Sequence, residues 1–185
     1  PAIIKMLTMS QNKAEESFSE FVNALHIVPV AISYEYDPCD GAKARELHER
    51  AMQGSYQKTE HEDLRSIALG ISGVKGDVHV SFGTPLCGQF NTPEAVAAAI
   101  DRQVVDLYVL HPTNFFAYRE LHGEFPALPC GAEADAFDAN RYADIERVFR
   151  ARIDALPADH RAQALAIYAN PIVSKLDPSV GVPEQ

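Results

Sequence analysis

The hydrophobic positions of this 185-residue chain are spaced mostly as in helices, but two stretches differ. The first is a continuous apolar run, Ile27 to Ile32, which opens a predicted strand over 27–36 and stops at Asp37-Pro38. The second is 78–82, where apolar and polar residues alternate as in a half-buried strand. Short apolar runs between breakers are typical of buried strands, and a residue that precedes proline is driven away from helix. The pattern therefore predicts an α/β protein whose sheet includes both stretches.

Helical spacing accounts for most of the rest of the chain. A helix is predicted at 2–9, and a second follows a cap at Asn12 and Glu15 and runs through Leu25. A third runs from Asp40 to Met52, and a fourth starts after the capping box Thr59-Glu60-His61-Glu62. The last three run from Thr92-Pro93 to Leu107, at 135–155 and from Asp159 onward. The helix after the capping box is expected to bury its stripe of Leu64, Ile67, Ala68 and Ile71. The order strand, helix, helix, strand favours a right-handed crossover between parallel strands of one sheet.

Charge and composition exclude several classes of protein. The formal net charge of -10 argues against nucleic-acid binding, which needs clustered positive charge. No apolar run approaches the ~20 residues that cross a bilayer, and no signal segment opens the chain. Cys39, Cys87 and Cys130 lack metal-binding spacing and are interpreted as reduced thiols. We expect a cytoplasmic protein, with peripheral attachment to the inner membrane as an alternative.

The first strand also carries a resemblance. Ile27-Val28-Pro29-Val30 resembles the fourth, proline-bearing motif of the glycerolipid acyltransferases. The stretch from Val28 through Leu86 and the ending Tyr168-Ala169-Asn170-Pro171 resemble the C-terminal half of a bacterial enzyme of that superfamily. The resemblance covers most of the chain. It implies an acyltransferase of phospholipid biosynthesis, which moves a fatty acyl group from acyl-CoA or acyl carrier protein to glycerol phosphate or a lysophospholipid, without a resident cofactor.

Substrate-binding residues are predicted around the proline motif. Proline cannot donate to a strand ladder, so Pro29 is unusual inside an apolar strand, and the resemblance implies that it shapes the pocket with Val28 and Val30. Ligands of open α/β sheets gather at the carboxyl ends of strands, which adds Tyr34 and Glu35. The alternative is that the tyrosine packs and that Glu35 is solvated.

Three cations follow on the helix that begins at Asp40. Lys43, Arg45 and Arg50 are candidates for attracting the phosphates of coenzyme A or the acidic face of a carrier protein. A mixed charged face is more often simply solvated, and that alternative stays open.

The catalytic pair of the family is missing from this chain. Its signature is a histidine followed five positions later by an aspartate, and none of the seven histidines satisfies it. The second and third motifs are missing as well. Two strands also make a marginal sheet, and the apolar strand needs neighbours on both sides. We therefore expect this chain to be the C-terminal portion of a larger enzyme, inactive alone, whose catalytic half lies upstream in the same protein.

The predicted organisation has three parts. Residues 1–90 form the C-terminal half of an acyltransferase α/β domain, part of an open mixed or parallel sheet covered by helices. Residues 91–176 form a helical C-terminal extension, and 177–185 form a loose tail. Three aromatic residues of the extension are expected to pack in the core, with an acyl-chain groove as the alternative, namely Phe115, Phe116 and Tyr118.

Other chemistry is less favoured by the sequence. His79 and His111 are interpreted as hydrogen-bonded structural histidines, and His61 has no second ligand four residues on, so no metal site is predicted. One rival function is a non-catalytic helical module with a closed core that docks a carrier protein or partner chain. A second is an N-terminal-proline tautomerase that uses Pro1 as its base.

Overall fold

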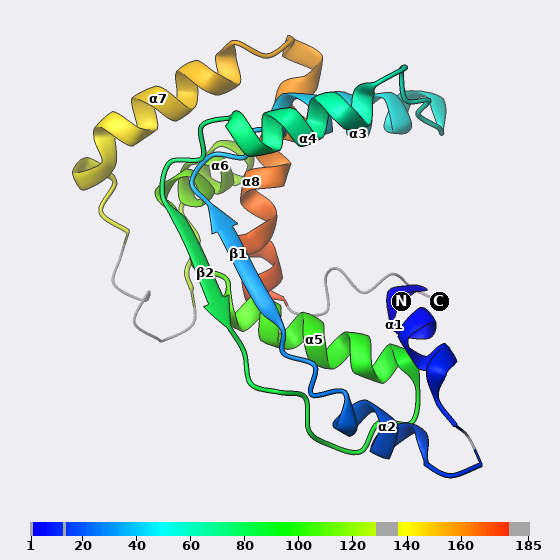
Figure 1. Ribbon diagram of the computed structural model, residues 1–185. Helices are drawn as coiled ribbons and strands as arrows, with labels where there is room; N and C mark the ends of the chain where they lie inside the picture. The colour runs from blue at the N-terminus through cyan, green and yellow to red at the C-terminus, as the bar shows by residue number, and fades with distance from the viewer. Residues whose placement is uncertain (1, 13, 129–136, 178–185) are drawn as a thin grey trace. The chain divides into compact units, whose positions relative to one another are not determined.

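A computed structural model describes residues 2–12, 14–128 and 137–177 (Figure 1). The elements are α1 (Ala2–Leu7), η1 (Thr8–Ser10), α2 (Phe18–Ala24), β1 (Val30–Tyr34), α3 (Asp40–Gln53), α4 (Glu62–Ser72), β2 (Val78–Phe82), α5 (Pro93–Leu107), α6 (Pro112–His122), η2 (Ala139–Tyr142), α7 (Ala143–Asp154), η3 (Ala158–His160) and α8 (Arg161–Leu176). Pro1, Cys130 and the predicted tail after Asp177 lie outside the described residues.

The described chain divides into two compact units, each built from more than one segment. The first unit contains residues up to 32 and 79–109, and the second contains 33–78 and 110–177. The proposed boundary between an α/β part and a helical extension near residue 90 stays a prediction.

The strands were located correctly, but their relative direction was not. Gly83 N donates to Pro29 O at 2.8 Å and Glu35 N donates to Asp77 O at 2.9 Å, so β1 and β2 form a two-stranded antiparallel sheet. The predicted parallel crossover is wrong. The structure gives a helical protein with one small sheet, and no further strand occurs within the described ranges.

The α3–α4 pair explains why β2 runs back along β1. A Cβ placed on Gly73, at the end of α4, would lie 2.5 Å from Pro38 Cβ, just ahead of α3. Farther along, Arg45 Nη2 of α3 lies 3.1 Å from Glu62 Oε1 at the start of α4. The two helices are therefore antiparallel. The second helix brings the chain back to the C-terminal end of β1, and β2 starts there.

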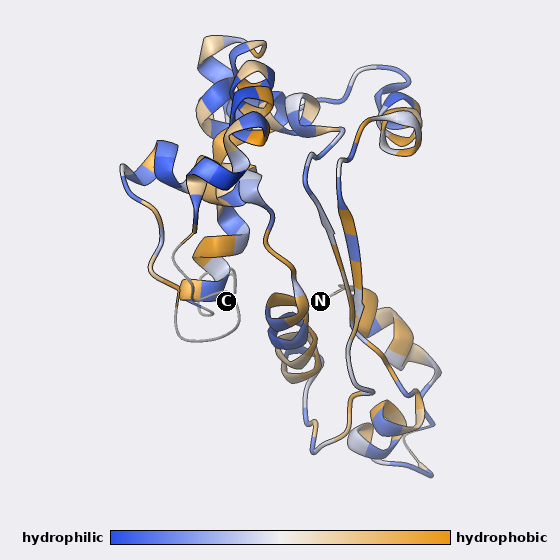
Figure 2. Cartoon of the chain, turned by 90° about the vertical axis from the view of Figure 1, so that its left-hand side faces the viewer, coloured by the Kyte–Doolittle hydropathy of each residue, from blue (hydrophilic) through white to orange (hydrophobic). Residues whose placement is uncertain are grey.

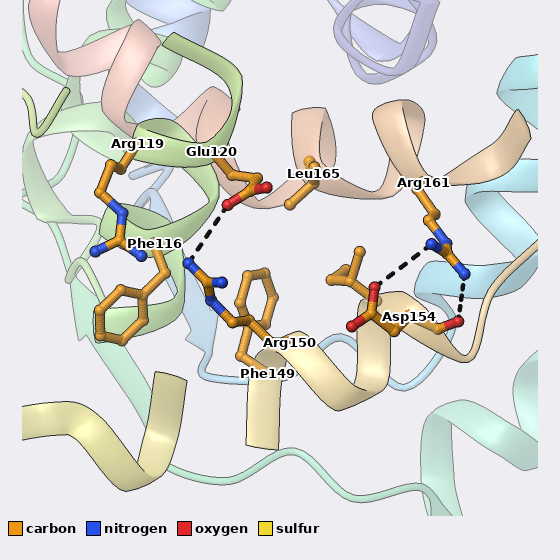
Figure 3. A pocket seen from close by; sticks show the side chains of 9 residues that line it. Phe116, Arg119, Glu120, Phe149, Arg150, Asp154, Arg161 and Leu165 are labelled. Carbon is orange, nitrogen blue, oxygen red and sulfur yellow. Dashed lines mark hydrogen bonds and ion pairs between the residues drawn. The ribbon is translucent and has the colours of Figure 1, made fainter. Parts of the chain in front are cut away.

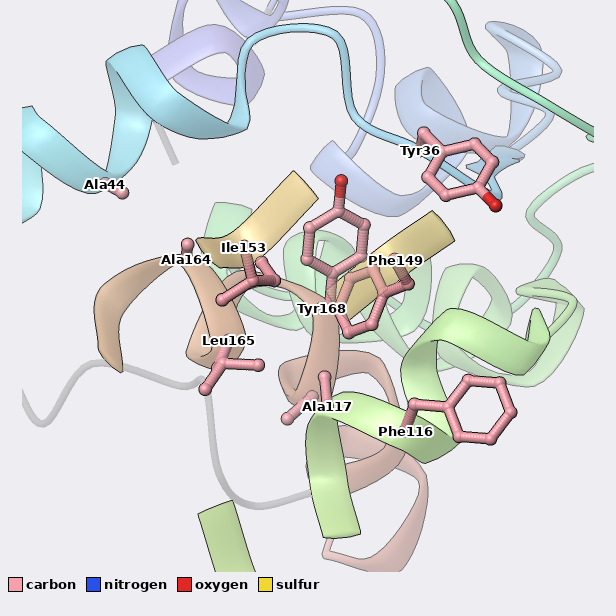
Figure 4. Packing of buried hydrophobic residues seen from close by; sticks show 10 residues of the cluster. Tyr36, Ala44, Phe116, Ala117, Phe149, Ile153, Ala164, Leu165 and Tyr168 are labelled. Carbon is pink, nitrogen blue, oxygen red and sulfur yellow. The ribbon is translucent and has the colours of Figure 1, made fainter. Parts of the chain in front are cut away.

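The second unit has its core among α3, α6, α7 and α8 (Figure 4). Ala44, Ala117 and Ala164 are fully buried, and small side chains let helices approach closely. The rings of Phe149 and Tyr168 meet edge to face, with centroids 5.0 Å apart. The predicted packing of aromatic residues from α6 is confirmed for Phe115 and Phe116, which are both buried.

The first unit has a smaller core, made by buried residues of α2, α5 and the segment after β2. The start of α2 differs from its prediction. Ser17 N donates to Glu20 Oε2 at 2.8 Å and Glu20 N donates to Ser17 Oγ at 3.2 Å, so this pair makes the capping box and α2 begins later than a cap at Asn12 requires. The predicted cap of α5 is confirmed, because Ala95 N donates to Thr92 Oγ1 at 3.1 Å.

The α4 stripe is the clearest error in the predicted core. Leu64, Ile67 and Ile71 are all exposed instead of buried. Half of the predicted capping box is present at the start of α4, because Thr59 N donates to Glu62 Oε2 at 2.9 Å. The N-cap residue itself is His61, and its side chain makes no cap bond. The stripe is unburied because no element within the described ranges covers it.

No helix among the described residues is long and apolar enough to cross a membrane.

Candidate functional site

The proline motif is held by the segment that follows β2. Pro29 is buried immediately before β1, and its carbonyl accepts the bond from Gly83. The carbonyl of Ile27 accepts from Leu86 N at 2.8 Å. A Cβ on Gly83 would lie 2.3 Å from Gln103 Oε1 and 3.2 Å from Pro29 O, so a side chain here would displace the Gln103 amide and crowd the Pro29 carbonyl. The motif is thus fixed at both of these carbonyls.

One face of the sheet is apolar and exposed. Val30 and Ile32 of β1 are 40% and 48% exposed, while Ala31 between them is buried. Val80 and Phe82 of β2 are 52% and 71% exposed. The Gly83–Pro29 bond sets Val30 opposite Phe82 and Ile32 opposite Val80, so these four side chains share a face of the sheet. Figure 2 colours the backbone of the chain by residue hydropathy, with hydrophobic residues in orange. Val28 is also exposed.

The two residues predicted at the end of the strand have different surroundings. Tyr34 is half-buried. Glu35 is buried, its Oε2 accepts from Asp77 N at 3.2 Å, and its carbonyl accepts from Thr113 Oγ1 at 2.7 Å. The alternative of a solvated Glu35 is therefore wrong. These contacts hold the start of β2 and the start of α6, and a role for either residue toward substrate stays a prediction.

The three predicted phosphate-binding cations do not converge. Lys43 Nζ lies 2.5 Å from Asp37 Oδ2, and Arg50 Nη2 lies 2.7 Å from Glu46 Oε1. Arg45 bonds the Tyr56 hydroxyl and pairs with Glu62 and Glu49. Each cation is thus balanced by a carboxylate, and an anion would have to compete with that partner. Their role toward coenzyme A stays a prediction.

A cavity of about 260 Å³ lies among α6, α7 and α8 (Figure 3). Its apolar lining is Phe116, Phe149, Ile153 and Leu165, and its charged lining is Arg119, Glu120, Arg150, Asp154 and Arg161. It is slightly smaller than the roughly 300–1,000 Å³ of typical ligand pockets. The space suits a short apolar segment that ends in a polar or anionic group.

The charges of the cavity are ordered by ion pairs. Arg150 Nη2 lies 3.7 Å from Glu120 Oε2, and Arg161 Nη1 lies 3.4 Å from Asp154 Oδ1 (Figure 3). Arg119 donates to Glu146 Oε1 at 2.6 Å, and this bond holds the pKa of Glu146 below its usual value. The groups near the cavity thus provide charge and shape.

A buried polar cluster joins α3, α7 and α8. Arg152 donates to Asp40 Oδ2 at 2.5 Å from Nε and to Asp40 Oδ1 at 3.0 Å from Nη2. The Tyr168 hydroxyl donates to Asp40 Oδ2 at 2.7 Å and accepts from Asp37 N at 2.9 Å. Burial, with the nearby Asp40 carboxylate, raises the pKa of Tyr168 above its ordinary value, so the phenol stays neutral. Asp40 was predicted to cap α3. Its Oδ1 accepts from Gly41 N at 2.7 Å at the start of the helix, and the same carboxylate serves this cluster.

A second buried polar pair joins His111 and Ser33. His111 Nε2 lies 3.0 Å from Ser33 Oγ, a distance typical of a serine and its base. Both residues are almost fully buried, at 3% and 1% exposed, and neither lines the cavity. Asn114 further fixes the turn, because its Oδ1 accepts from His111 N at 2.6 Å. His111 is therefore a hydrogen-bonded structural histidine, as predicted.

Comparisons with known proteins give no assignment: no protein-family model matches the chain, and no curated protein or solved structure is significantly similar to it.

Sequence reasoning missed the cavity and the buried polar cluster. One local signal for the cavity exists, since Arg119 follows the buried Phe116 at helical spacing i+3. The cluster has no local signal, because Asp40 is separated from Arg152 and Tyr168 by more than a hundred residues.

Proposed function

We propose that this chain forms part of a glycerolipid-type acyltransferase that moves a fatty acyl group from acyl-CoA or acyl carrier protein to glycerol phosphate or a lysophospholipid. In the complete enzyme, β1 and β2 belong to a larger open sheet, and the catalytic histidine and aspartate come from the other half of the same protein. We place the reaction in the cytoplasm, at the membrane surface where its lipid product is used.

The exposed apolar face of the sheet carries this proposal. Val30, Ile32, Val80 and Phe82 form a contiguous apolar surface beside the proline motif. Contiguous exposed apolar surface of this kind usually marks an interaction site. The exposed stripe of α4 adds more apolar surface that needs a cover. A helical module that docks a carrier protein or partner chain could use such a surface as well, and the acyl-transfer assay distinguishes the two functions.

The reaction assigns separate tasks to the two halves. The acceptor hydroxyl oxygen attacks the thioester carbonyl, a general base takes the hydroxyl proton, and the thiol leaves as the new ester forms. The base would come from the catalytic half. This chain would contribute Pro29 and its neighbours to the acceptor pocket. The apolar cavity beside Phe116 and Phe149 would hold part of an acyl chain, with Lys43 and its neighbours steering phosphate.

The test is an acyl-transfer assay on the complete protein that contains this chain. Radiolabelled palmitoyl-CoA and palmitoyl carrier protein are each offered with glycerol 3-phosphate and with lysophosphatidic acid, and labelled ester is separated by chromatography. We expect transfer to at least one acceptor, and a loss of roughly tenfold or more in Pro29→Gly because the pocket is misplaced. Pro126→Gly, in the loop after α6, is the matched control. The proposal fails if no combination yields labelled ester.

A further inference from the structure

Two histidines and an aspartate from distant parts of the sequence meet in the second unit. His48 lies in α3, whereas Asp159 and His160 belong to η3. His48 Nε2 is 3.7 Å from Asp159 Oδ2, and His160 Nε2 is 3.9 Å from Asp159 Oδ1. One ligand atom from each residue can be chosen so that all three lie within 4.8 Å of one another.

We propose that His48, Asp159 and His160 bind a divalent transition-metal ion of the zinc type. Zinc binds imidazole nitrogen and carboxylate oxygen at about 2.0–2.2 Å, so two ligand atoms on a tetrahedral ion lie about 3.4 Å apart. The two histidine–aspartate separations exceed this by up to about half an ångström, and the three ligand atoms together lie within 4.8 Å, so rotations of the three side chains are needed to close the site around an ion. Two imidazoles and one carboxylate favour zinc, copper, iron or nickel over magnesium and calcium.

The present contacts leave room for an ion between the three groups. The nitrogen–oxygen distances of 3.7 and 3.9 Å are too long for hydrogen bonds. Among the ion pairs within the described ranges, Asp159 meets the two histidines and no lysine or arginine. The histidine side chains are 22% and 16% exposed, whereas that of Asp159 is 61% exposed. The site is therefore partly sheltered on the imidazole side and open to solvent on the carboxylate side.

The backbone around these residues is firmly placed. A Cβ on Gly41 would lie 3.1 Å from Leu156 Cδ2, so α3 packs closely against the turn before η3. His160 N donates to Pro157 O at 2.9 Å, and Arg161 Nε donates to Leu156 O at 3.0 Å. A metal ion here would tie α3 to the connection between α7 and α8. With three protein ligands, it would keep at least one position for water or a further ligand.

The experiment is zinc titration of the chelator-treated full chain by calorimetry, with cobalt(II) absorption as a second readout. We expect one ion per chain and cobalt bands typical of nitrogen and oxygen ligands. His48→Gln, His160→Gln and Asp159→Asn should each weaken zinc binding by about tenfold or more. His122→Gln, an exposed histidine in the last turn of α6, is the matched control and should bind as the wild type does.

The exposed Asp159 keeps the test decisive if a histidine variant fails to fold. Far-UV circular dichroism of each metal-free variant establishes its fold. The proposal is overturned if the wild type binds no zinc, or if a folded Asp159→Asn variant binds zinc as tightly as the wild type. Acyl transfer plays no part in this readout, so its outcome is independent of the proposed function.

Discussion

Tyr168→Phe is expected to destabilise the second unit strongly. The hydroxyl is buried, donates to Asp40 at 2.7 Å and accepts from Asp37 N at 2.9 Å. A hydrogen bond to a charged group contributes about 1.5–3 kcal/mol, and a buried donor left unsatisfied costs about 1–3 kcal/mol. Because Asp40 keeps its Arg152 partner, we expect the free energy of unfolding to fall by about 3 kcal/mol. That is a large share of the ~5–15 kcal/mol of a typical domain.

Urea denaturation followed by far-UV circular dichroism measures this loss. A fall of about 3 kcal/mol lowers the midpoint by about 1 M urea or more. Tyr56→Phe is the matched control, because its hydroxyl also bonds a carboxylate and an arginine, Glu62 and Arg45, in a more exposed setting. Water replaces those bonds, so we expect a loss below about 1 kcal/mol. Equal losses in the two variants would refute the reasoning.

The same tyrosine predicts a dependence on alkaline pH. Its pKa is raised in the folded state, so the unfolded chain loses the phenolic proton first, near pH 10. The stability contributed by the neutral phenol is fully present below that pH and is lost as pH rises above it. The difference between wild type and Tyr168→Phe should therefore narrow above about pH 10. A difference that stays constant up to pH 11 would contradict this assignment.

Two further changes test local geometry. Gly83→Ala should lower the free energy of unfolding by about 1–3 kcal/mol, because the added methyl group displaces Gln103. Gly70→Ala, in the open middle of α4, should instead be stabilising. Calorimetric melting temperatures that move in the same direction for the two variants would contradict this. Glu62 has a pKa lowered to about 2 from an ordinary 4.5, chiefly by the Tyr56 hydroxyl, so its contribution is present above pH 4.5 and is lost as pH falls toward 2. Melting temperatures of wild type and Glu62→Gln should converge over that range, and parallel curves would count against the bond.

Local patterns in the sequence were enough to locate most elements. The apolar run before Asp37-Pro38 and the alternation at 78–82 gave both strands, and Thr92-Pro93 gave the start of α5. These signals depend on neighbouring residues, which is why they could be recognised without knowing the fold.

Long-range pairing was beyond reach of the same patterns. Strand direction depends on the antiparallel course of α3 and α4, which the order of elements does not encode. Burial of the α4 stripe depends on a cover that its own periodicity cannot reveal. The approach of His48 to Asp159 likewise depends on how α3 packs near η3, across more than a hundred residues of sequence. Sites made by such approaches have no spacing motif.

The central claim is the proposal that this chain belongs to an acyltransferase in which the exposed face of β1 and β2 is covered. Its most direct test compares Ile32→Asp with Met52→Asp, since both side chains are exposed in this structure. Burying a charged side chain away from water costs several kcal/mol. If another part of the complete protein covers this face, Ile32→Asp should lower the rate of acyl transfer by about tenfold or more. Met52→Asp should leave the rate near that of wild type. Equal rates in the two variants, or an absence of acyl transfer in wild type, would contradict the account.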